Sequence, residues 1–218
     1  MDILEIEILT DNVEATEKFY NHILELKIIR KDPYTISFLA GKTVLSFLQS
    51  NKINPLYHFA FNIPNNKFEE AISWISSKLD IIKIKDNEIV ADFKSWNAKA
   101  FYCYDNNRNI IEFIARYELD NESDKPFGGA SIQSVSEIGI VTEDVPKLTD
   151  DLIEREKLFL FSKQARQDDF SVIGDDKGLF IIVKEDRKWY PTEQKAGKYY
   201  SRIKISVEGL LKEIILNE

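Results

Sequence analysis

Residues 102–113 read YCYDNNRNIIEF, and this stretch decides how the chain is interpreted. Apolar residues on both sides of the polar run DNNRN predict a β-strand, a tight turn and a second strand. The second strand carries one acid, Glu112, among isoleucine and phenylalanine neighbours. An ionised carboxylate buried there costs several kcal/mol unless it is paired or binds a metal ion. Glu112 is therefore a candidate metal ligand, and the open alternative is an edge strand on which it faces water.

The chain repeats one plan, in which an alternating strand is followed by a polar turn and a helix. The copies are EIEILTDNVEATEKFY from Glu5, HFAFNIPNNKFEEAISW from His58, EIGIVTEDVPKLTDDL from Glu137 and a shorter RIKISVEGLLKEI from Arg202. Polar residues typical of a helix start, followed by apolar residues at helical spacing, predict amphipathic helices near 12–26 and 66–79. With the β-rich runs that follow these helices, the repeating unit is β-α-β-β-β.

Composition narrows the classes of protein. The 218 residues suffice for one long or two small domains, and the formal net charge of −8 argues against nucleic acid or anionic membranes, which need basic patches. The single cysteine, Cys103, allows no disulfide within the chain and fits a reducing compartment. The first residues carry acids where a signal peptide needs bases, and no apolar run is long enough to span a membrane. We expect a cytoplasmic protein without nucleic-acid or membrane partners.

These units resemble the vicinal oxygen chelate superfamily, which includes glyoxalase I, extradiol dioxygenases, and fosfomycin- and bleomycin-resistance proteins. The resemblance rests on the tandem units and on the run WNAKAFYCYDNNRNIIEF that closes the second one at Phe113. In the family, such a run holds a tryptophan, a strand, a turn and a metal-binding glutamate. Asn106 and Arg108 replace the usual proline and glycine of that turn. The match is good over residues 2–117 and holds only in plan over 135–216.

The resemblance implies an α+β fold in which tandem βαβββ modules form a cupped mixed sheet with the helices outside. Residues 1–118 would be a glyoxalase-like domain of two modules, residues 119–134 a polar linker, and residues 135–218 a second, incomplete glyoxalase-like domain. Family geometry pairs two modules in one cup. The strands that begin the first two units, at Glu5 and His58, are therefore expected in the same sheet.

The same geometry takes metal ligands from the first and last strands of the paired modules. It implies the set Glu5, His58 and Glu112, with Leu45 at a fourth position where it cannot bind metal. Strand alternation supports this placement, because His58 shares a face with Ala60 and not with Phe59 and Phe61. One imidazole and two carboxylates suit Mn(II), Fe(II), Ni(II) or Zn(II). The open alternative is a solvent-exposed face with incidental acidic and histidine side chains.

Two functions remain open at this stage. The first is a metal-dependent lyase, isomerase or transferase of the glyoxalase type, in which the metal polarises oxygens of a small substrate in the N-terminal cup while a carboxylate moves a proton. Glu7 is the candidate base, and Asn62, Tyr102 and Tyr104 are candidate substrate-binding residues. The second is a metal-free protein of the bleomycin-resistance type that binds or sequesters a small molecule. Ring cleavage is not expected, since the chain has only two histidines.

The second half of the chain offers little toward a site. Glu137 stands at the first-strand position of the third unit and Arg202 at that of the fourth, and no metal set is expected there. We expect this half to be a packing partner, a lid or the surface of a homodimer. Its aromatic residues, including Trp189 and Tyr190, are expected to fill an interface rather than to line a ligand mouth.

Overall fold

Strand β1 (Asp2–Thr10) shows how the sequence builds the core. Ile3, Ile6 and Ile8 are fully buried, whereas Glu5 and Glu7 lie on the opposite face of the strand. A β-bulge between Ile3 and Glu5 adds one residue, which brings Ile3 onto the same face as Ile6 despite their odd spacing. The strand therefore presents one apolar face and one acidic face.

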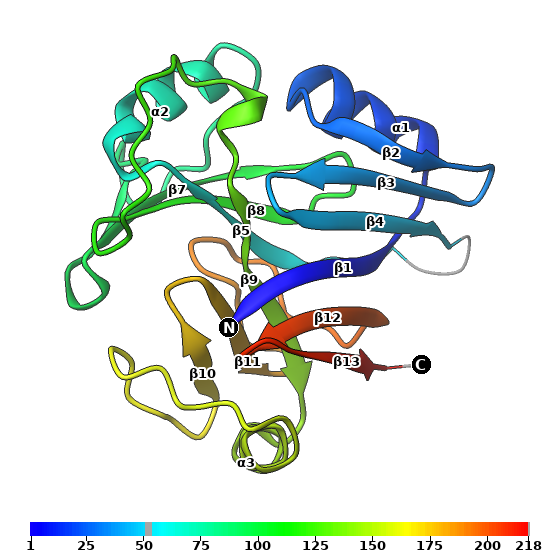
Figure 1. Ribbon diagram of the computed structural model, residues 1–218, viewed down its shortest axis with the longest axis vertical. Coiled ribbons are helices and arrows are strands. Elements are labelled where there is room, and N and C mark those ends of the chain that lie inside the picture. The colour runs from blue at the N-terminus through cyan, green and yellow to red at the C-terminus, as the bar shows by residue number, and fades with distance from the viewer. Residues whose placement is uncertain (51–53, 218) are drawn as a thin grey trace.

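The structure is a computed structural model that describes residues 1–50 and 54–217. Over these residues the chain forms two curled mixed sheets (Figure 1). The first sheet has the order β13-β12-β1-β4-β3-β2. Its other strands are β2 (Lys27–Lys31), β3 (Thr35–Ala40), β4 (Thr43–Gln49), β12 (Ser201–Val207) and β13 (Leu210–Leu216). Parallel pairing of β1 with β4 closes the first unit.

The second sheet has the order β10-β11-β9-β5-β8-β7-β6. Its strands are β5 (His58–Ile63), β6 (Ala91–Phe93), β7 (Ala98–Tyr104), β8 (Ile110–Arg116), β9 (Ser134–Thr142), β10 (Phe170–Asp175) and β11 (Gly178–Lys184). The first strand of each unit again runs parallel to its last strand, β5 beside β8 and β9 beside β11. The repeated units are thus present, and the fourth is reduced to the β12–β13 hairpin.

The units do not pair in the expected way. The prediction that the first two units share a sheet is wrong, because β1 pairs with β12 of the fourth unit and β5 pairs with β9 of the third. A physical reason lies in the charges along β1: Glu5 is paired with Lys204 and Glu7 with Arg202 on its polar face. Each sheet draws strands from both sides of residues 119–134, and the domain boundaries predicted there remain a prediction.

The helices pack at the periphery of the sheets (Figure 1). Among the described residues they are α1 (Val13–Glu17), which continues as a π-helix over Lys18–Ile23, α2 (Phe68–Ser76), α3 (Val145–Glu156) and short 3₁₀ turns at Asn65–Lys67, Lys94–Trp96 and Gly129–Ser131. The side chain of Asn12 caps α1 by accepting a hydrogen bond from the backbone N–H of Ala15. Within the described residues, no helix is long and apolar enough to cross a membrane.

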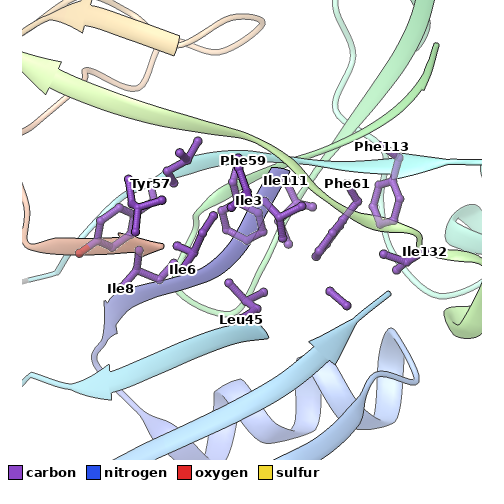
Figure 2. Close-up of a cluster of buried hydrophobic side chains, with 14 of the residues drawn as sticks. Ile3, Ile6, Ile8, Leu45, Tyr57, Phe59, Phe61, Ile111, Phe113 and Ile132 are labelled. Carbon is purple, nitrogen blue, oxygen red and sulfur yellow. The ribbon is translucent and has the colours of Figure 1, made fainter. Parts of the chain in front are cut away.

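The main core lies where the two sheets face each other. Figure 2 shows Ile3, Ile6 and Ile8 of β1 beside Phe59 and Phe61 of β5, all of them fully buried. Because successive side chains of a strand point to opposite faces, β5 turns His58, Ala60 and Asn62 away from this core. The alternation predicted for β5 is therefore present, and the polar face of the second sheet is free to form a site.

Candidate metal centre

His58, Glu112 and Glu137 lie on three adjacent strands of the second sheet, β5, β8 and β9. Ala60 is paired with Glu112 on one side and with Glu137 on the other, and His58 lies two residues from Ala60 on the same face. One ligand atom of each lies within 4.8 Å of the others. All three side chains are buried. The strand register therefore brings one imidazole and two carboxylates to one point.

The imidazole of His58 is oriented for metal binding. Its Nδ1 atom lies 3.1 Å from the backbone carbonyl oxygen of Ile110, which can only accept, so the proton belongs on Nδ1. The lone pair on Nε2 then faces Oε2 of Glu112 at 3.5 Å. Burial lowers the pKa of His58 to about 4, although the Ile110 carbonyl opposes this shift. The ring is therefore neutral near neutral pH, with Nε2 as an acceptor.

The two carboxyl groups share one buried cation. Burial raises the pKa of Glu112 well above its usual value, and the charge of Glu137 adds to the shift. Burial also raises the pKa of Glu137, while the guanidinium of Arg116, which donates a hydrogen bond to it, opposes the shift. The Tyr102 hydroxyl hydrogen bonds to Glu112 from the facing position on β7. Arg116 thus counters the rise in pKa at both carboxyl groups without reversing it.

These three groups can hold a metal ion. Ligands that each lie about 2.1 Å from a zinc-like ion stand roughly 3.0–3.5 Å from one another. The separation of 3.5 Å between His58 Nε2 and Glu112 Oε2 is at that scale, and Glu137 needs only a small shift. The second-layer partners, Ile110 for the imidazole and Arg116 for a carboxylate, are the kind that orient ligands in metal sites.

A cavity of about 340 Å³ adjoins the three groups. Apart from His58, Glu112 and Glu137, its wall is largely aromatic with a few polar side chains: Phe93, Ser95, Trp96, Tyr102, Gln164, Gln167, Phe170, Ile181, Arg187, Trp189 and Tyr190. Residues from the second and third units therefore enclose one small-molecule-sized space beside the candidate metal ligands.

Trp189, which was expected to fill an interface, lies in the cavity wall. Its ring centre is 5.2 Å from that of His58. Gly139 makes room for the indole, because a Cβ atom at that position would lie 2.5 Å from Trp189 Cη2. Tyr190 follows it into the wall and meets Tyr102 edge to face, with ring centres 5.8 Å apart.

The structure does not bring Glu5 to the other two predicted ligands. Glu5 lies in the first sheet, where its carboxylate pairs with Lys204 at 2.8 Å and with Arg202 at 3.4 Å. Glu7, the predicted base, is held in the same sheet by Arg202 at 2.9 Å and by the hydroxyl of Tyr200 at 2.8 Å. The two acids neutralise the positive charges of Arg202 and Lys204 on β12, because β1 is paired with the fourth unit instead of the second.

The three predicted substrate-binding residues have different surroundings. Tyr102 lines the cavity beside Glu112, as the prediction requires. Asn62 shares the face of His58 but lies outside the cavity wall, and its side-chain amide donates a 3.4 Å hydrogen bond to the backbone of Asp176. Tyr104 is also outside the wall, with the guanidinium of Arg108 stacked 4.0 Å from its ring centre.

Glu137 is the candidate ligand that sequence reasoning missed. It occupies in the third unit the same first-strand position that His58 occupies in the second. The repeat in the sequence therefore already indicated Glu137 as a possible ligand. The position equivalent to Glu112 in the third unit is apolar, since Ile181 reaches the cavity from β11. Leu45, the apolar residue expected beside the site, lies instead in the core between the sheets (Figure 2).

No protein-family model matches the sequence, and no curated protein matches it. Solved structures do. A candidate dioxygenase from Bacillus subtilis subsp. subtilis str. 168 is similar over 99% of this chain and 84% of its own, with a TM-score of 0.63 and 14% identity. A glyoxalase I mutant from Zea mays is similar over 89% of this chain and 70% of its own, with a TM-score of 0.58 and 14% identity. This likeness confirms the predicted fold class.

Proposed function

We propose that this chain, which has the glyoxalase and dioxygenase fold of the vicinal oxygen chelate superfamily, binds a divalent metal ion through His58, Glu112 and Glu137. We further propose that it acts on a small oxygen-bearing substrate in the adjoining cavity, as a lyase, isomerase or transferase. The observation that carries the proposal is the meeting of three buried acceptor groups at one point. Buried acceptors that face one another are costly unless a proton or a cation lies between them.

The donor set decides which ions fit. One imidazole and two carboxylates form a hard, oxygen-rich set that suits Mn(II), Fe(II), Ni(II) or Zn(II). Ile181 stands where a fourth protein ligand would come from, and an apolar side chain leaves that side of the site open to the cavity. An open position is the mark of a catalytic rather than a structural metal site.

The residues of the chain have separate roles in this proposal. A bound ion would polarise the substrate oxygens. Glu112 is the candidate to move a proton, through the carboxyl oxygen that does not bind the ion, because burial raises its pKa above the usual value. Burial raises the pKa of Tyr102 well above its usual value, so its phenol stays protonated and donates to Glu112. Arg116 orients Glu137 and stabilises its charge.

Calorimetric titration of chelator-treated protein with each of the four ions tests the proposal. We expect one ion per chain for the wild type, and loss of stoichiometric binding in His58→Ala and in Glu137→Gln. Glu5→Gln is the matched control, since Glu5 is an acid at the same first-strand position of another unit and pairs with Lys204 and Arg202 instead. Loss of binding in Glu5→Gln but not in Glu137→Gln would reject this ligand set.

A metal-free binding protein is the second candidate. The aromatic wall favours it, because Phe93, Trp96 and Tyr190 supply stacking surface whether or not a metal ion is bound. If the wild type takes up none of the four ions, the enzyme proposal fails and this second function becomes the better account of the cavity.

A further inference from the structure

Arg187 is the one lysine or arginine in the cavity wall, as far as the described residues show. Its Nε atom lies 3.3 Å from a carboxylate oxygen of Asp169, and its guanidinium lies 4.8 Å from the ring centre of Phe170. No further side-chain partner of Arg187 occurs in the part of the chain that the structure describes. Its terminal Nη donors are therefore available to a ligand with an anionic group.

Arg187 lies at the opposite end of the cavity from the acids. Glu137 on β9 is paired with Leu179, whereas Phe170, on which Arg187 stacks, is paired with Val183. These two levels are four residues apart on β11, or roughly 13 Å along the strand. The cavity is therefore polarised, with the two carboxyl groups at one end and a guanidinium at the other.

Aromatic rings form the wall between these ends. Tyr190 meets Tyr102 at a ring-centre distance of 5.8 Å and Phe93 at 6.3 Å, both edge to face. Trp189 adds an indole whose Nε1–H is buried and has no hydrogen-bond partner among the described residues. A planar ring would stack on this wall.

The size of the cavity limits the ligand. A volume of about 340 Å³ is near the small end of the range for ligand pockets, which runs from about 300 to 1,000 Å³. Such a space suits one substituted ring and excludes most polycyclic or peptide-sized ligands. A carboxylate matches the planar fork of a guanidinium better than a neutral polar group does.

We propose that the cavity binds a monocyclic aromatic carboxylate, with the ring against Tyr102, Trp189 and Tyr190 and the carboxylate on Arg187. The inference rests on the proposed function, since it assigns a substrate class to the same cavity. It adds the charge of the substrate, its shape and the residue that selects it. The acids at the other end remain free to meet oxygen substituents of the ring.

Tryptophan fluorescence gives a direct test, because Trp96 and Trp189 line the cavity whereas Trp74 packs on Phe127 elsewhere. We would titrate the protein with benzoate, with benzamide as its neutral analogue, and with cyclohexanecarboxylate as its non-aromatic analogue. Benzoate is expected to change the emission and to bind at least about tenfold more tightly than either analogue. Equal affinities for the three, or no signal with benzoate by fluorescence and calorimetry, would overturn the inference.

Arg187→Met isolates the role of the guanidinium, since it keeps an unbranched side chain about as long as the aliphatic part of arginine and removes the charge. It should lower the affinity for benzoate by about tenfold or more and leave that for benzamide unchanged. Arg166→Met is the control, because Arg166 is a surface arginine paired with Asp150 and lies outside the cavity wall. Unchanged benzoate affinity in Arg187→Met, with native circular dichroism, would refute the assignment.

Metal titration of the same preparations separates the two proposals. Stoichiometric metal binding without preference for benzoate refutes the substrate class and leaves the metal site standing. Preference for benzoate that depends on Arg187, in protein that binds none of the four ions, supports the ligand assignment and refutes the metalloenzyme.

Discussion

Glu112 and Glu137 lie in different units of the chain, yet both are paired with Ala60, one on each side of it. Side chains of directly paired residues point to the same face of a sheet, so the methyl group of Ala60 lies between the two carboxyl groups. Ala60 is completely buried. The small residue at this position leaves the space in which the two acids and His58 can meet.

Ala60→Leu should therefore abolish metal binding without touching a ligand. The larger side chain would occupy the space between Glu112 and Glu137 and hold their oxygen atoms apart. Calorimetry with Zn(II) measures the loss. Ala60→Gly is the matched control: it should keep the metal site at a cost of roughly 0.5–1 kcal/mol in stability. Full binding by a folded Ala60→Leu variant would contradict the proposed position of the ion.

Arg116 and Glu137 form a buried ion pair whose loss should be costly. Their side chains are 0% and 3% exposed, so Arg116→Met leaves a buried carboxylate without its cation. Such a change typically costs about 3–5 kcal/mol in the free energy of unfolding, which urea denaturation measures. Adding Glu137→Gln to Arg116→Met should recover part of that loss, because the uncompensated charge is removed.

A surface pair provides the comparison for Arg116. Arg166 and Asp150 are 30% and 65% exposed, and Arg166→Met should cost no more than about 1 kcal/mol. Equal effects at Arg116 and Arg166 would mean that the buried pair is not the source of the stability.

The sequence predicted the units and their alternation well because both are local properties. Apolar residues two apart on β5, and the turn between β7 and β8, need no knowledge of distant segments. These patterns placed His58 and Glu112 on one polar face, and the structure brings them within 3.5 Å. The pairing of units depends instead on which strand edges meet across the chain, and the alternation within each strand does not determine that.

The wrong neighbour for β1 explains why Glu5, and not Glu137, was predicted beside His58 and Glu112. Glu5 and Glu137 stand at equivalent positions of their units, and only the pairing of β5 with β9 selects Glu137. The residues Arg202 and Lys204 opposite the acids of β1 were visible in the sequence and fit the actual pairing. The cavity wall was harder to predict, because Arg187 and Trp189 come from a segment outside any strand.

Burial of His58 predicts a titration far from the usual one. Its pKa is lowered to about 4, so its ring proton resonances should shift with a midpoint near pH 4 in nuclear magnetic resonance spectra of metal-free protein. His58→Asn assigns the signal by removing it, while its amide can still donate to the Ile110 carbonyl. A midpoint near 6.5 would show that the ring is solvated.

The same shift has a consequence for stability. Between pH 6.5 and 4 the unfolded chain binds the proton that folded His58 refuses, so this residue stabilises the fold fully above pH 6.5 and progressively less as pH falls to 4. The loss amounts to about 3 kcal/mol. Asp105 has the opposite effect on the pH dependence of stability, since burial raises its pKa to about 6. The difference in unfolding free energy between the wild type and His58→Asn therefore isolates the histidine, and it should shrink on acidification.

Gly139→Ala should displace Trp189, which lines the cavity, by adding a methyl group on β9. The added Cβ atom would lie 2.5 Å from Trp189 Cη2 and 3.2 Å from the backbone oxygen of His58, closer than the packing allows. The indole must move away from β9, at a cost of about 1–3 kcal/mol in stability. Urea denaturation measures the cost, and tryptophan emission reports the displaced ring.

Gly128→Ala is the control for this effect, because a Cβ atom there would meet only the flexible end of Glu25 at 3.8 Å, in an extended backbone that any residue adopts. It should change neither stability nor emission. If Gly139→Ala behaves like Gly128→Ala, then Trp189 does not rest on β9 in solution, and the wall that separates His58 from solvent must be formed by other residues.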